Sequence, residues 1–171
     1  MNSAAMQRSL ERLTLEILER NQGIEGLALI GIHTGGVCMA DRLLEKIVAH
    51  EQKELPVASL DITLYRDDWS LVSQNPIVRK TNINFSVEDK TVILVDDVLF
   101  TGRTIRAALD AIMDYGRPRA IQLAVLVDRG GRELPIQPDY TGTCIRAEAS
   151  ERVDVLFSEH AEKDQVVVDI K

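Results

Sequence analysis

The stretch VILVDDVLFTGRTIRAAL, residues 92–109, decides the fold of this chain. It opens on the apolar run VILV, which is typical of a strand covered on both faces. Two adjacent aspartates, Asp96 and Asp97, and a Thr-Gly-Arg-Thr turn follow, and apolar side chains then recur at helical spacing over residues 105–113. The order of strand, polar loop and helix predicts one repeat of an α/β sheet.

The same alternation runs along most of the chain. Short apolar runs at residues 27–32, 57–62 and 121–127 predict further strands, and helical spacing predicts helices over residues 6–18 and 37–48. Consecutive strands joined by helices pair in parallel through right-handed crossovers. The predicted fold class is therefore α/β, a mostly parallel twisted sheet flanked by helices.

Two segments depart from this alternation. Residues 64–89 are polar and long for a connection, which predicts a flexible lid or an extended hairpin. Residues from about 128 to 171 are irregular but contain the strand-like runs 153–157 and 166–170, which predicts a small C-terminal cap or an edge addition to the sheet. The length and the apolar content of 45% predict a single domain over residues 1–171.

The acidic pair lies where a parallel sheet binds its ligands, at the carboxyl end of a strand. Two carboxylates at about 4 Å repel by about 4 kcal/mol at an effective dielectric constant of 20, so Asp96 and Asp97 need a cation, hydroxyl donors or amides nearby. Residues 101–104 begin the next helix, where unpaired amides attract an anion and Gly102 permits its close approach. Together these features predict a sugar phosphate site.

A simpler alternative exists for each feature alone. Adjacent aspartates are often a solvated turn, and a TGRT sequence often only caps a helix. Other phosphate loops are excluded, because the chain contains neither a G-x-x-x-x-G-K-[ST] nor a G-x-G-x-x-G sequence.

Composition limits the remaining classes of function. The net charge is −7 and basic residues are interspersed with acidic ones, so general attraction to nucleic acid is not predicted. Cys38 and Cys144 lack the spacing of a zinc site and are interpreted as reduced thiols. No apolar run approaches the roughly 18 residues of a membrane span. We therefore expect a soluble cytoplasmic protein with no membrane partner.

The segment VILVDDVLFTGRT resembles the characteristic motif of the type I phosphoribosyltransferases, which bind 5-phosphoribosyl 1-pyrophosphate (PRPP) and Mg²⁺. GIHTGG at residues 31–36, DITLYRDD at 61–68, the segment 116–136 and DYTG at 139–142 further resemble the PyrR-type family of bifunctional pyrimidine operon regulators and uracil phosphoribosyltransferases. The resemblance runs from the first predicted helix to about Val155.

This resemblance implies transfer of ribosyl phosphate from PRPP to N1 of uracil, which gives uridine monophosphate (UMP) and pyrophosphate. The implied cofactor is Mg²⁺, held chiefly by oxygens of the substrate rather than by protein ligands. Family members associate, so the resemblance also implies a homo-oligomer, either a dimer or a tetramer.

The resemblance implies four groups of site residues. The first group is catalytic. In it, Asp96 and Asp97 are expected to hold the ribose hydroxyls and to stabilise developing positive charge, and Arg66 is expected to neutralise pyrophosphate when the lid closes. The others are the PRPP loop Val98, Leu99, Phe100, Thr101, Gly102, Arg103 and Thr104, the pyrophosphate loop His33, Thr34 and Gly35, and the uracil-binding residues Asp128, Arg129 and Val153.

Several of these assignments have structural alternatives. Arg66 lies in a YRDD run that could be a self-paired charge cluster on the surface. Asp128 and Arg129 could form an ion pair that ends a strand. Many family members also carry a basic residue in the pyrophosphate loop, where this chain has HTGG at residues 33–36. This departure implies either that Arg66 carries more of the leaving-group charge or that turnover is lower.

Two other functions stay open. The first is an RNA-binding attenuator of pyrimidine genes that senses UMP or UTP, with weak or no catalysis. Arg20 fits this role, but Gly131, Gln137 and Thr143 stand where family members often have cations for operon mRNA, and the tail is acidic.

The second is a phosphoribosyltransferase for another base, such as a purine. Purine sites usually stack the base on an aromatic ring, and the sequence offers only Phe157 or Tyr140 near the cap. Uracil is preferred mainly on the resemblance.

Overall fold

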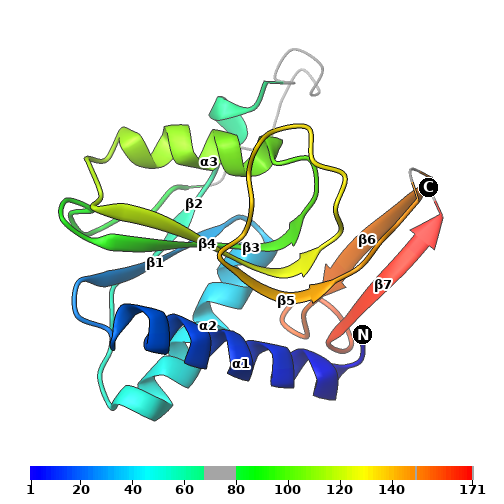
Figure 1. Cartoon of the computed structure of the whole chain (residues 1–171), viewed down its shortest axis with the longest axis horizontal. Coiled ribbons are helices and arrows are strands. Elements are labelled where there is room, and N and C mark those ends of the chain that lie inside the picture. Colours follow the sequence, from blue (N-terminus) through cyan, green and yellow to red (C-terminus); the bar gives the residue numbers. More distant parts are fainter. Residues whose placement is uncertain (68–79, 149, 171) are drawn as a thin grey trace.

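Figure 1 shows the computed structural model of the chain, which describes residues 1–67, 80–148 and 150–170. Within these residues a five-stranded parallel sheet has the order β2-β1-β3-β4-β5. Its strands are β1 (Leu27–Ile32), β2 (Val57–Leu60), β3 (Thr91–Leu99), β4 (Ala120–Asp128) and β5 (Tyr140–Cys144). The predicted α/β class and the parallel sheet are confirmed.

Helices cover both faces of this sheet (Figure 1). The helices α1 (Ser3–Asn21) and α2 (Gly35–Glu51) pack on one face, and α3 (Arg103–Met113) packs on the other. In β3 the side chains of Ile93 and Val95 join the cluster of α1 and α2, whereas Val92 and Leu94 join the cluster of α3. The apolar run VILV is continuous because alternate side chains enter two separate cores.

The strand ends differ from the sequence prediction in ways that matter for the site. β2 ends at Leu60, before residue 62, because Asp61 Oδ1 accepts a hydrogen bond from the amide of Thr63 at 2.7 Å and turns the chain. β3 continues through both aspartates to Leu99, which pairs with Asp128 of β4. The acidic pair is therefore part of a strand that extends to the sheet's edge.

The predicted lid hairpin is not seen in the described residues. Residues 68–79, which include Trp69, lie outside them. Before residues 68–79, Thr63–Tyr65 forms a short 3₁₀ helix, η1. After them, residues 80–90 form a single β-bridge, between Asn82 and Ser59. Here Val87 is buried in the α3 cluster, so this segment is held by side-chain packing rather than by a strand ladder.

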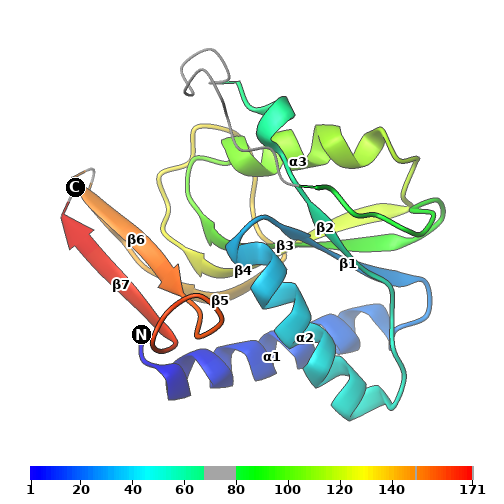
Figure 2. The ribbon, with the colours of Figure 1, turned by 180° about the vertical axis from the view of Figure 1, so that it is seen from behind.

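Residues 128–171 contain both of the features predicted for them, an edge addition to the sheet and a small cap. Their first portion supplies β5, a parallel edge strand of the main sheet, where a Cβ on Gly142 would lie 2.5 Å from the carbonyl oxygen of Leu126. Only β6 (Glu151–Leu156) and β7 (Gln165–Ile170) stand apart, as an antiparallel pair that we call the cap hairpin. Figure 2 shows this hairpin beside the start of α1, where the amino terminus donates to the Val166 carbonyl at 2.8 Å.

Candidate active site

Two cavities meet at the carboxyl ends of β1 and β3, where Asp97 and Val98 line both. The larger cavity, of about 800 Å³, lies between the sheet and the cap hairpin. The smaller, of about 300 Å³, lies toward η1. Both cavities are lined by residues that the sequence predicted for the site. Those at the larger cavity are Thr34, Gly35, Asp97, Val98, Phe100, Arg129 and Val153. Those at the smaller cavity are His33, Arg66, Asp96, Asp97, Val98 and Thr104.

The acidic pair is held in a fixed orientation by the backbone. The amide of Asp97 donates to Asp96 Oδ1 at 3.1 Å, and the amide of Val98 donates to Asp97 Oδ1 at 2.9 Å. Burial raises the pKa of Asp96 well above its usual value, and the neighbouring carboxylate adds repulsion. Burial also raises the pKa of Asp97, and the negative charge of Asp154 on the cap hairpin adds to this increase. A cation or hydroxyl donors would favour the charged form of this pair.

Three glycines let the loop after β1 lie directly against β3. A Cβ on Gly35 would fall 2.1 Å from Asp97 Oδ2, and one on Gly36 would fall 2.3 Å from the carbonyl oxygen of Val95. A Cβ on Gly31 would fall 2.6 Å from the carbonyl oxygen of Gly36. The glycines of the GIHTGG sequence are therefore required for packing, and they bring the predicted pyrophosphate loop into contact with the acidic pair.

His33 and Thr34 lie at the start of α2. The peptide bond between them is cis. Thr34 is exposed at the larger cavity, whereas His33 lines the smaller one and its Nε2 is buried without a hydrogen-bond partner among the described residues. A buried donor or acceptor without a partner is uncommon, so this nitrogen is suited to a polar group of a ligand.

The predicted PRPP loop forms the start of α3. Gly102 precedes the helix with φ of 91°, in the left-handed region that favours glycine. Thr101, Arg103 and Thr104 line a small hollow of about 160 Å³ together with Arg66. Leu99 is different, because its side chain is 1% exposed and belongs to the core, so only its backbone can take part in binding.

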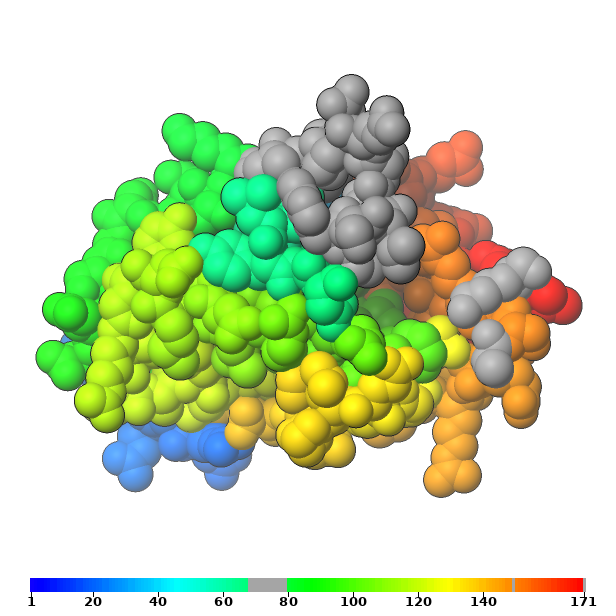
Figure 3. All heavy atoms as spheres, turned by 90° about the horizontal axis from the view of Figure 1, so that it is seen from above, coloured from blue at the N-terminus to red at the C-terminus, as the bar shows by residue number. Residues whose placement is uncertain are grey.

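Arg103 joins the two segments that flank this loop. Its guanidinium pairs with Asp67 at 2.5 Å and with Glu133 at 2.6 Å. In Figure 3, which looks onto the α3 side, the segments around these two carboxylates lie on either side of the start of α3. The loop is therefore enclosed by the segment that ends at Asp67 and by the loop after β4.

The residues predicted to bind uracil do not all reach the larger cavity. Arg129 is buried at 7% exposure with its guanidinium 3.8 Å from the ring centre of Phe100, and Val153 enters from β6. Asp128 is not among the lining residues, because it accepts from the amide of Gly130 at 2.8 Å and pairs with Arg132 at 2.6 Å. Thus Asp128 does form an ion pair, but with Arg132 rather than with Arg129.

The sequence prediction missed several lining residues. Asp61 lines the smaller cavity. It could have been predicted from its position just after β2, because the carboxyl ends of β2 and β3 lie at the same edge of the sheet as Asp96. The cap hairpin and its turn add further lining to the larger cavity, and no local pattern identified these residues. They are Arg152, Asp154, Val155, Leu156, His160, Ala161, Val167 and Asp169.

The part of the chain that the structure describes contains neither a cluster of metal ligands nor a membrane-spanning helix. Over residues 1–67, 80–148 and 150–170, no three His, Cys, Asp or Glu side chains are grouped as metal ligands would be. No helix in the same part of the chain has the length and apolar content needed to cross a membrane.

Comparison with known proteins identifies the family. The family model of the phosphoribosyl transferase domain matches residues 2–158. A protein named bifunctional protein PyrR from Acetivibrio thermocellus is 53% identical over 159 residues, which cover 93% of this chain and 86% of that protein. The protein of the same name from Thermus thermophilus is 54% identical over 166 residues, which cover 97% of this chain and 92% of that protein.

Solved structures show the same fold at much lower identity. A hypoxanthine-guanine phosphoribosyltransferase from Bacillus anthracis is 17% identical and superimposes with a TM-score of 0.67 over 85% of this chain and 82% of that chain. A hypoxanthine phosphoribosyltransferase from Trypanosoma cruzi is 18% identical, with a TM-score of 0.66 over 85% of this chain and 79% of that chain. The chain therefore belongs to the phosphoribosyltransferase family and, within it, to the bifunctional PyrR proteins.

Proposed function

We propose that this protein is a cytoplasmic uracil phosphoribosyltransferase that converts uracil and PRPP to UMP and pyrophosphate. The observation that carries the proposal is the convergence of one strand end and two loops at one edge of the sheet. The acidic pair, the glycine-packed loop of residues 33–36 and the phosphate loop that begins α3 all border the two joined cavities.

The proposed reaction breaks the bond between C1 of the ribose and the pyrophosphate oxygen, and the bonding electrons leave with pyrophosphate. N1 of uracil then forms the new bond to C1 and loses its proton. Because positive charge develops on the ribose, carboxylates fixed beside it stabilise the transition state. Asp97 is best placed for this role, since it lines both cavities, and Asp96 holds its amide.

The phosphate groups have separate sites in this proposal. The 5′-phosphate binds the amides and hydroxyls of residues 101–104 at the start of α3. Pyrophosphate lies by the loop of His33, Thr34 and Gly35, with Arg66 of the smaller cavity beside it. The buried pair of aspartates fits a requirement for Mg²⁺, because hard oxygen donors suit that cation directly or through substrate hydroxyls. When bound, Mg²⁺ supplies charge neutralisation at pyrophosphate.

The base is proposed to bind in the larger cavity, against Val153 and Arg129. Among the aromatic residues considered for purine stacking, Tyr140 is directed elsewhere, since its hydroxyl donates to Gln122 at 2.6 Å. The guanidinium of Arg129 covers one face of the Phe100 ring, and Phe157 is 3% exposed. These positions favour a pyrimidine over a stacked purine.

The test is UMP formation from labelled uracil, PRPP and Mg²⁺, with hypoxanthine, guanine and orotate in parallel reactions. Turnover with uracil alone is expected. Turnover with a purine but not with uracil would overturn the proposed substrate. Binding of PRPP without turnover of any base would overturn the proposed catalysis.

A second function is suggested by the name bifunctional that the relatives carry. We propose as this second function binding of pyrimidine operon mRNA by a homo-oligomer, controlled by UMP or UTP. Arg20 is the predicted contact, although it pairs with Asp139 at 2.8 Å and lies 5.5 Å from the ring centre of Tyr140. Filter binding of the operon leader at two salt concentrations tests this, and an absence of salt-sensitive affinity would exclude it.

A further inference from the structure

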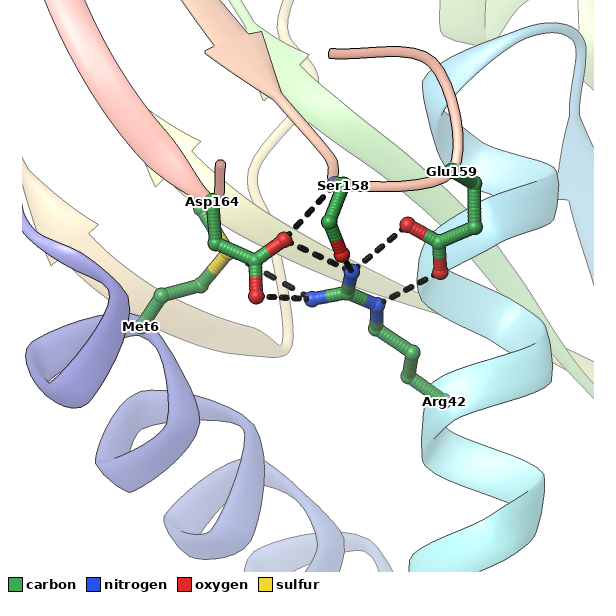
Figure 4. Close-up of polar contacts among 5 residues, drawn as sticks. All are labelled: Met6, Arg42, Ser158, Glu159 and Asp164. Atoms are coloured by element: carbon green, nitrogen blue, oxygen red, sulfur yellow. Dashed lines mark hydrogen bonds and ion pairs between the residues drawn. The ribbon is translucent and has the colours of Figure 1, made fainter. Parts of the chain in front are cut away.

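Arg42, in the middle of α2, makes an unusually complete set of contacts with the turn of the cap hairpin (Figure 4). Its Nε and Nη2 donate to the two carboxylate oxygens of Glu159 at 2.8 and 2.6 Å. Its Nη1 and Nη2 donate to the two oxygens of Asp164 at 2.8 and 2.7 Å. Nη2 also donates to Ser158 Oγ at 3.1 Å.

This contact is enclosed rather than on the open surface. The side chains of Arg42 and Asp164 are 11% and 8% exposed, and the guanidinium carbon lies 4.9 Å from the ring centre of Phe157. Two bidentate pairs from one guanidinium fix its position and that of both carboxylates. Only arginine has the planar arrangement of donors that this requires.

The turn that Arg42 holds is part of the wall of the larger cavity. Phe157, His160 and Ala161, all in the segment between β6 and β7, line that cavity. Within the same segment, the amide of Ser158 donates to Asp164 Oδ1 at 2.8 Å, so Asp164 both closes the turn and binds Arg42. The position of this wall is therefore tied to the guanidinium.

The opposite wall of the cavity is tied to the same helix. α2 begins at Gly35, and Thr34 and Gly35 line the larger cavity. Both the predicted pyrophosphate loop and the turn of the cap hairpin are thus fixed relative to α2, one at its start and the other through Arg42. A rigid helix between two walls sets the distance between them.

We propose that Arg42 is a positioning residue, which orients the cap hairpin over the base subsite and thereby sets the affinity for the base without touching it. This inference rests on the proposed function for the identity of the base. The contacts themselves belong to the chain whatever that base is.

The test compares Arg42→Met, which keeps the aliphatic stem and removes the charge, with the matched control Lys46→Met. Lys46 is also on α2, and its ion pair at 2.9 Å is with Glu11 of α1 rather than with a residue of the cap hairpin. Arg42→Met is expected to raise KM for uracil and the Kd for UMP about tenfold, which corresponds to about 1.4 kcal/mol. The Kd for ribose 5-phosphate and the kcat should change less than about twofold, and Lys46→Met should change none of these.

Two milder variants keep the test valid if Arg42→Met does not fold. Arg42→Lys retains the charge but cannot bridge both carboxylates, and Glu159→Gln retains a hydrogen bond at a residue that is 41% exposed. Both should give intermediate losses in UMP affinity. Equal losses for UMP and ribose 5-phosphate would overturn the proposal, because they would indicate general destabilisation.

Failure of the proposed function can be told from failure of this inference. If the unaltered chain binds neither uracil nor UMP, the proposed function is wrong. In that case, amide hydrogen exchange tests the role of Arg42 in the hairpin without any ligand. Arg42→Met should raise the exchange rates of residues 157–166 and leave the main sheet protected. Unchanged exchange there would overturn the role of Arg42.

Discussion

At the scale of single residues, the candidate site contains two adjacent buried carboxyl groups, an arrangement that does not favour folding. Asp96 is 6% exposed and adjoins a second carboxylate, although a buried charge without a charged partner is unfavourable. Asp97 is constrained in addition by the absence of a side chain on Gly35. Such arrangements persist in functional sites, where stability is reduced in favour of binding.

Asp96→Asn is expected to stabilise the ligand-free chain at neutral pH. In the folded chain the pKa of Asp96 lies above the value of about 3.9 found in unfolded chains. The folded state therefore holds the proton more tightly, so the free energy of unfolding falls as pH rises between the two pKa values. Asparagine removes this fall while its oxygen still accepts from the Asp97 amide. Urea unfolding at pH 4 and pH 8 checks this, and equal pH slopes for both chains would contradict it.

Asp97→Asn should lower kcat for UMP formation by about 10²- to 10³-fold, because the variant lacks negative charge beside the developing cation. The fold should persist, since the amide oxygen still accepts from Val98. Steady-state rates, with circular dichroism as the control for folding, provide the measurement. Near-normal turnover would show that the ribose cation is stabilised elsewhere.

Gly35→Ala and Gly36→Ala should separate the site from the fold. The added methyl group at residue 35 meets the side chain of Asp97 at 2.1 Å, whereas the one at residue 36 meets the backbone oxygen of Val95 at 2.3 Å. A side chain can move but a buried strand cannot, so Gly35→Ala should chiefly abolish activity and Gly36→Ala should chiefly lower the melting temperature. Thermal unfolding beside activity distinguishes them, and the reverse pattern would contradict this assignment.

At the scale of elements, the sheet and α3 together build the proposed phosphate site. β3 carries the acidic pair to the carboxyl edge of the sheet, and Gly102 then turns the chain into the helix, where Thr101, Arg103 and Thr104 line the small hollow. The geometry of one residue thus determines where a whole helix begins.

Gly102→Ala should cost about 1 to 2 kcal/mol of stability through its left-handed φ of 91°, and it should also weaken binding of ribose 5-phosphate. The control is Gly23→Ala at the end of α1, where φ is 106° and nothing lies within 4 Å of a Cβ. This control should lose similar stability and keep its affinity. Calorimetric titration beside denaturation measures both, and equal affinity losses would count against a phosphate site at α3.

At the scale of the whole molecule, the main sheet and the cap hairpin share the proposed substrate site. Their hydrophobic contacts are continuous, since Val153, Phe157 and Val166 belong to the same core cluster as α1 and α2. A ligand that binds between them should therefore stabilise the chain as a unit.

PRPP with Mg²⁺ at about 100 times its Kd should add about 2.7 kcal/mol to the free energy of unfolding, which raises the melting temperature by about 5 to 10 °C. Removal of Mg²⁺ with a chelator should reverse most of this shift, because the cation balances pyrophosphate against the acidic pair. Differential scanning calorimetry gives the measurement. A shift unaffected by chelation would argue against a role of Mg²⁺ in donor binding.

The sequence by itself determined the α/β class, the chain order of four strands, and the association of Asp96 and Asp97 with the loop of residues 101–104. These features are local: apolar periodicity reports burial within one element, and a strand-loop-helix order brings neighbours in sequence together in space. Even so, β5 was missed, because a short edge strand of Tyr, Thr and Gly residues has little periodicity of its own.

Only the tertiary structure decided which distant side chains share the site. It joined Asp61 to the smaller cavity, moved Asp128 away from the larger one into a pair with Arg132, and set the cap hairpin against α2 through Arg42. Each of these depends on contacts between elements far apart in the chain. Their energies come from burial and pairing in the assembled fold, which no local pattern of residue types records.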